Sequence, residues 1–154
     1  MTIHPARAVA GLALGAAGFV VGVAALAVLL AKLLVNAGMP IHPADVATLN
    51  DVVAVLPFVI AFAVVNLVAA AGLVLGTDWA QRLAVVVSTI GAIVGAFGLF
   101  LVVAGHDPFA TGKSARGYTD GVEIIATFTV TYLVVLGLVA VARQPVRRFV
   151  RRAA

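Results

Sequence analysis

Four uninterrupted apolar runs constrain the fold of this chain more than any other feature. They cover about residues 8–35, 52–75, 83–105 and 122–142. A helix of about 20 residues crosses the ~30 Å hydrocarbon layer of a bilayer, so every run is long enough to span it. Only helices and closed barrels satisfy all backbone polar groups in that layer, and these runs lack the alternation of barrel strands. We therefore predict an all-α membrane protein, a four-transmembrane-helix up-down bundle.

The composition narrows the class of protein further. The chain is 64% hydrophobic and 10% charged, whereas a soluble domain is about half apolar and a quarter charged. It has no cysteine, which excludes disulfides, thiol redox chemistry and thiolate metal sites. The interiors of the spans carry no acidic residue, arginine or histidine, so neither a proton-coupled exchanger of the small multidrug type nor a haem-binding anchor subunit is expected. We predict a protein that is not an enzyme and that uses no cofactor.

The distribution of basic residues predicts the orientation. With the N-terminus inside, seven arginines lie inside and three basic residues lie outside, which agrees with the positive-inside rule. The inside set is Arg7, Arg82, Arg143, Arg147, Arg148, Arg151 and Arg152, and the outside set is Lys32, Lys113 and Arg116. We expect both termini in the cytoplasm and the protein in a bacterial cytoplasmic membrane. Lys32 is interpreted as a lysine that reaches the outer headgroups, with a cation facing a bundle cavity as the alternative.

Two of the predicted helices carry stripes of small residues. Residues three and four apart share one helix face, and small residues there let two membrane helices approach closely. We predict that these stripes are helix-packing faces that meet at the centre of the bundle, or that one of them pairs with a second copy. The stripes are Gly11, Gly15, Gly18 and Gly22 in the first run, and Ser88, Gly91, Gly95 and Gly98 in the third.

A few polar residues fall inside the spans. Asn66, Ser88 and Thr89 lie ten to twelve residues from the turn at Gly76–Thr77, so they should share one depth. A buried asparagine in a membrane needs a partner, and we predict a hydrogen bond from Asn66 to Ser88 or Thr89. Tyr132 is also expected to be buried with its hydroxyl bonded.

Turn residues predict where helices begin and end. Gly76 should stop the second helix, Thr77 should cap the third, and Asp78 should lie in its first turn. Asp120 followed by Glu123 resembles a capping box that would start the fourth helix.

Histidines and acids in the two outer loops allow a weak metal hypothesis. His42, Asp45, His106 and Asp107 could ligate zinc, but no helical spacing holds them in register. Ordinary loop polarity explains them better, and we predict no metal site.

Residues 143–154 form a basic juxtamembrane tail. If this tail is helical, its arginines lie opposite Val146, Phe149 and Val150, as in a segment that lies on a membrane surface. We expect contact with anionic headgroups, with a simple orientation signal as the alternative, and we expect no nucleic-acid binding. The arginines are Arg143, Arg147, Arg148, Arg151 and Arg152.

Three functions remain open at this point. The leading hypothesis is a non-enzymatic accessory or structural subunit of a membrane assembly, working as a homo-oligomer or within a larger complex with membrane lipids around it. The rival is a small-solute transporter or channel with a polar lining at Asn66, Ser88 and Thr89. An intramembrane lipid-modifying enzyme that uses the outer histidines is the weakest of the three.

Overall fold

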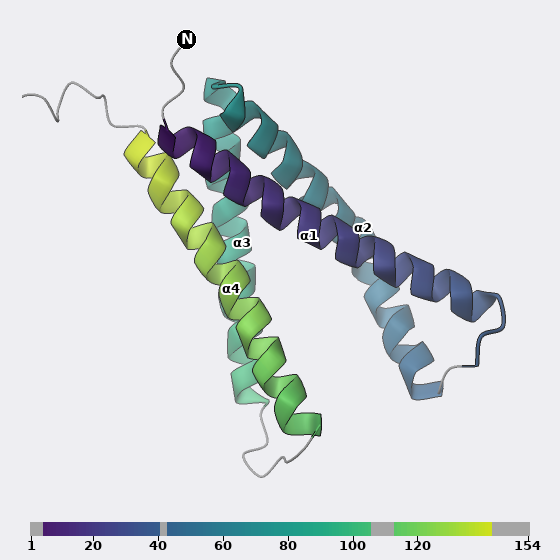
Figure 1. Ribbon diagram of the computed structural model, residues 1–154. Coiled ribbons are helices and arrows are strands. Elements are labelled where there is room, and N and C mark those ends of the chain that lie inside the picture. The colour runs from purple at the N-terminus through teal and green to yellow at the C-terminus, as the bar shows by residue number, and fades with distance from the viewer. Residues whose placement is uncertain (1–4, 41–42, 106–112, 143–154) are drawn as a thin grey trace, which may run out of the picture.

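The computed structural model describes residues 5–40, 43–105 and 113–142, and the side chains of 43–45, 47–48 and 113–116 are outside the description. Within these residues the chain forms four long helices (Figure 1). They are α1 (Pro5–Asn36), α2 (Pro43–Val74), α3 (Asp78–Ala104) and α4 (Lys113–Ala142). Each contains a stretch long and apolar enough to cross a membrane. The prediction of an all-helical protein with four membrane-spanning candidates is confirmed.

Two helices begin well before their apolar runs. α2 starts at Pro43 and α4 starts at Lys113. Proline is tolerated in the first turn of a helix, where its missing N–H has no partner to lose. The predicted capping box is therefore wrong, because Asp120 lies inside α4. No proline interrupts residues 113–121, and the helix runs through both Gly117 and Gly121.

The turn between α2 and α3 follows the sequence closely. Gly76 adopts φ +75°, the left-handed conformation that ends a helix at low steric cost. Thr77 occupies the N-cap position with extended backbone, and Asp78 lies in the first turn. The Thr77 hydroxyl does not cap α3, because it donates to the carbonyl of Gly72 at 2.9 Å. The side chain thus closes the end of α2 instead.

The helices form two closely packed pairs, α1 with α2 and α3 with α4. α1 also packs on α4, and α2 on α3, which resolves how the first and last helices are related. The two pairs converge at the end that holds the starts of α1 and α3, and they diverge towards the opposite end (Figure 1). We call these the closed end and the open end. The molecule is a four-helix bundle in the shape of a V.

The two stripes of small residues do not meet. A Cβ added at Gly11 would lie 2.9 Å from Val74 Cγ2, and one at Gly18 would lie 2.9 Å from Asn66 Cβ, so the first stripe faces α2. The second stripe faces α4, because a Cβ at Gly91 would lie 2.6 Å from the ring of Tyr132. The expectation that the stripes pack against each other is therefore wrong. Each stripe serves the pair that its own helix forms with the next helix in the chain.

Candidate functional site

A polar network at the closed end joins all four helices. Arg7 of α1 donates to the carbonyl of Gly76 at 3.3 Å and to Oε1 of Gln81 at 3.0 Å. Its guanidinium also lies 3.5 Å from the carboxylate of Asp78, which is 90% exposed. Gln81 in turn donates to the carbonyl of Val139 in α4 at 3.3 Å. One arginine and one glutamine therefore tie α1 and α4 to the α2–α3 turn.

Gln81 is a residue that sequence reasoning missed. It is only 6% exposed and stands among buried alanines of α3. The sequence does contain a hint of its role. Gln81 lies three residues after Asp78, near the start of α3, at the same end of the bundle as Arg7 near the start of α1. Buried polar side chains keep a partner because an unsatisfied one is costly, and Gln81 uses both ends of its amide.

A second polar contact lies in the middle of the bundle. The Tyr132 hydroxyl donates to Oδ1 of Asn66 at 3.3 Å, and Nδ2 of Asn66 donates to the carbonyl of Phe62 at 2.7 Å. Asn66 and Tyr132 are both buried, as predicted. The predicted partner of Asn66 is wrong, because neither Ser88 nor Thr89 bonds it.

Tyr132 reaches Asn66 because α3 leaves room for its ring. Gly91 lies against that ring, and the neighbouring Gly95 lies against Thr129 of α4. The ring also meets Phe62 and Phe128 at centroid distances of 5.9 and 6.5 Å. The long tyrosine crosses the bundle from α4 to α2, a span that the short side chains of Ser88 and Thr89 cannot match.

Ser88 and Thr89 have different surroundings. Ser88 is fully buried, and its hydroxyl has no hydrogen-bond partner among the described residues. Thr89 is exposed and donates to the carbonyl of Val85 in its own helix at 2.8 Å. The expectation that Thr89 is buried is wrong, since one residue further along α3 turns it by about 100°. The predicted polar lining of Asn66, Ser88 and Thr89 is therefore not assembled on one surface.

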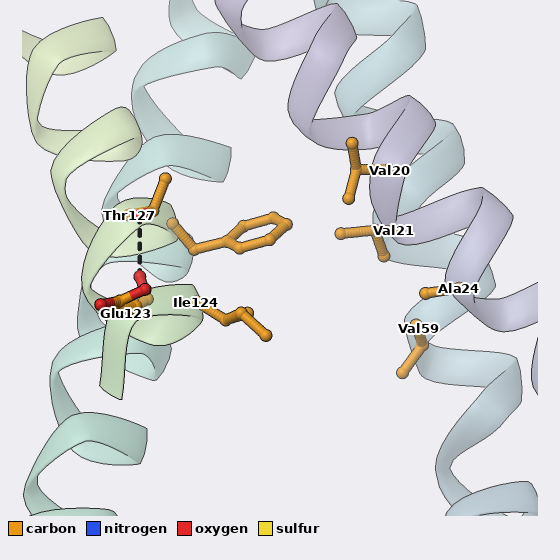
Figure 2. Close-up of a pocket in the computed structure, with 8 residues that line it drawn as sticks. Val20, Val21, Ala24, Val59, Glu123, Ile124 and Thr127 are labelled. Carbon is orange, nitrogen blue, oxygen red and sulfur yellow. Dashed lines mark hydrogen bonds between the residues drawn. The ribbon is translucent and has the colours of Figure 1, made fainter. Parts of the chain in front are cut away.

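Apolar cavities occupy the space between the two helix pairs. Three of them have volumes of about 640, 540 and 420 Å³, and Phe128 lines all three. We call the largest the interpair groove. In Figure 2, α1 and α2 supply one wall of this groove and α4 supplies the other. The lining residues are Val20, Val21, Ala24, Val59, Glu123, Ile124, Thr127 and Phe128.

Glu123 is the charged residue in the lining of the interpair groove. It lies on the α4 wall one turn from Thr127, whose hydroxyl donates to the Glu123 backbone carbonyl at 2.7 Å (Figure 2). The carboxylate is therefore not engaged by Thr127. The capping-box pattern predicts Glu123 in the first turn of the fourth helix, whereas the structure places it well inside α4.

Near the open end, Lys32 of α1 donates to Oδ1 of Asn50 in α2. This contact places the Lys32 ammonium beside α2, and the interpretation of the lysine as reaching the outer headgroups stays a prediction. The contact ties α1 to α2 within one pair and does not cross to the other pair.

Several predicted residues lie outside the description. His42, His106 and Asp107 are among them, as are the side chain of Asp45 and the whole basic tail from Arg143 onward. Where the structure describes the chain, it contains no group of three or more metal-ligating side chains.

Comparison of the chain with protein families, with curated proteins and with solved structures finds no match.

Proposed function

We propose that the protein is a non-enzymatic integral membrane protein that acts as an accessory or structural subunit of a membrane assembly. The observation that supports this most is the use of its polar side chains. Arg7 and Gln81, Asn66 and Tyr132, and Lys32 and Asn50 all bond between helices. These groups hold helices in place, and none of the pairs combines a nucleophile with a base.

The apolar exterior supports the same proposal. Large side chains are exposed along all four helices, for example Leu12, Phe58, Phe97 and Leu133. Lipid or partner helices must cover such surfaces, and small membrane helices associate through packing rather than through charge.

The first test is the mass of the protein extracted in native nanodiscs. A discrete homo-oligomer or a stoichiometric protein partner is the expected result. A stable monomer without a partner that carries out transport on its own would remove the proposal.

The rival function is a small-solute transporter or channel. The observation that favours it is the fully buried hydroxyl of Ser88, which has no partner within the described chain. The rival predicts that Asn66→Leu abolishes solute flux into liposomes. The accessory proposal predicts no flux to abolish.

We further propose an up-down arrangement in a bacterial cytoplasmic membrane with both termini inside, on the strength of the arginine distribution. The absence of cysteine makes a clean test available. A cysteine introduced at Gly112 should react with an impermeant maleimide in intact cells, and one at Ala154 only after permeabilisation. The opposite pattern contradicts the orientation.

The basic tail is proposed to bind anionic headgroups through its five arginines. Each is worth about 1 kcal/mol near an anionic surface, so a peptide of residues 143–154 should bind vesicles that contain phosphatidylglycerol. Equal binding to phosphatidylcholine vesicles would contradict this.

A further inference from the structure

The interpair groove combines apolar walls with one charged side chain. Val20, Val21 and Ala24 of α1 face Ile124 of α4 across it, and Glu123 stands beside Ile124 (Figure 2). Its volume of about 640 Å³ lies within the ~300–1,000 Å³ typical of small-molecule sites. The groove therefore has the size and the polarity of a site for an apolar molecule.

No described cation balances the charge of Glu123. Arg7 is engaged at the closed end with Gln81 and Asp78. Lys32 bonds Asn50 of α2, and Arg82 belongs to the first turns of α3. Glu123 is exposed at this wall, so its carboxylate can be reached by a positive group, which it attracts by a Coulomb interaction.

We propose that the interpair groove binds a lipophilic organic cation that enters from the bilayer. Its apolar body lies between the valines of α1 and Ile124, and its positive charge lies against the carboxylate of Glu123. Phe128, which lines the same groove, adds to its apolar wall. This site is independent of the proposed accessory role, which rests on association with other chains.

The test is equilibrium dialysis of tetraphenylphosphonium against the full-length protein in phosphatidylcholine nanodiscs, with empty nanodiscs subtracted. Tetraphenylborate, which has the same shape and the opposite charge, is the matched probe. We expect the wild-type protein to prefer the cation. Glu123→Gln should weaken cation binding about three- to fivefold, the scale of an exposed ion pair, and should not weaken tetraphenylborate binding.

Two further variants locate the site. Asp120→Asn removes an exposed acid from the preceding turn of α4 that does not line the groove, so cation binding should change less than about twofold. Ala24→Phe places a ring in the groove and should abolish binding of both probes. Unchanged cation binding in Glu123→Gln, an equal loss in Asp120→Asn, or full binding in Ala24→Phe would each overturn the proposal.

Discussion

The two ends of the V are held by different kinds of contact. At the closed end, Arg7 bonds Gln81 from α1 to α3 and Gln81 bonds Val139 from α3 to α4. Core residues such as Ala10, Leu14 and Ala84 are completely buried. At the open end, the recorded polar tie between Lys32 and Asn50 stays within one pair. Between the pairs lie cavities lined by valine, isoleucine and phenylalanine. Polar ties between the pairs therefore lie at the closed end and, through Tyr132 and Asn66, in the middle of the bundle. The groove lies on the open-end side of that middle bond.

The same comparison explains the placement of glycine. Within each pair, glycine lets the backbone of one helix approach the other, as at Gly18 against Asn66 and at Gly91 against Tyr132. Between the pairs, cavities of several hundred Å³ remain. The α1–α2 and α3–α4 interfaces are therefore closely packed, and the cavities lie between these two pairs.

The largest expected effect comes from breaking the network at the closed end. Gln81→Leu removes the acceptor of Arg7 and the donor to Val139, and it leaves a partly buried guanidinium short of a partner. We expect a loss of about 2 kcal/mol in the free energy of unfolding. Circular dichroism during denaturation in mixed micelles measures it. Arg82→Met, which removes an exposed arginine one residue away, should change the stability by less than about 0.5 kcal/mol, and equal losses would contradict the network.

A smaller loss is expected from crowding the α1–α2 interface. A Cβ at Gly18 would lie 2.9 Å from Asn66 Cβ and 3.1 Å from the carbonyl of Ala63, so Gly18→Ala should cost about 1–2 kcal/mol. Gly22→Ala is the matched control, because its Cβ would meet Ala63 at an ordinary 3.9 Å. The same denaturation assay applies. A Gly22→Ala variant as unstable as Gly18→Ala would show that the first stripe does not act through this contact.

The buried hydrogen bond in the middle of the bundle should contribute less. Tyr132→Phe keeps the ring against Gly91 and deletes only the bond to Asn66, so the expected loss is about 0.6 kcal/mol. A double-mutant cycle with Asn66→Leu isolates the pair. A coupling energy near zero would mean that the 3.3 Å contact contributes nothing.

The smallest effect is expected near the open end. Lys32→Met removes an exposed bond to Asn50 and should change the stability by less than about 0.5 kcal/mol. The unfolding midpoint in mixed micelles should stay within error of the wild type. A loss as large as that of Gln81→Leu would erase the distinction between the two ends.

The sequence predicts some levels of this structure better than others. Four apolar runs and the turn at Gly76 determine the helices and the α2–α3 hairpin, because length, hydrophobicity and glycine conformation are local properties. The partner of Asn66 could not be predicted from depth. It depends on the reach of Tyr132 across α3, and the packing of α1 on α4 was open from the sequence alone.

The candidate groove was harder to predict than the fold. Periodicity identifies which helix faces carry small residues. It does not show that the first stripe packs on α2 and the second on α4. The apolar run that contains Glu123 begins at about residue 122, so the sequence predicts a helix start near it, whereas α4 starts nine residues earlier. Gln81 could not be singled out from the sequence, because a single amide near a helix start is also what the headgroup region of a membrane would accommodate. Its role is visible only when the fold brings Arg7 next to it.

The divergence of the two pairs is the central claim, and one distance measurement tests it most directly. The chain has no cysteine, so spin labels attach only at introduced sites. Pulsed electron paramagnetic resonance in nanodiscs should compare exposed positions of α1 and α4 at both ends, Val9→Cys with Val141→Cys at the closed end and Leu33→Cys with Asp120→Cys at the open end. The account predicts a clearly longer mean distance at the open end. Equal distances at the two ends would show a parallel-sided bundle and contradict it.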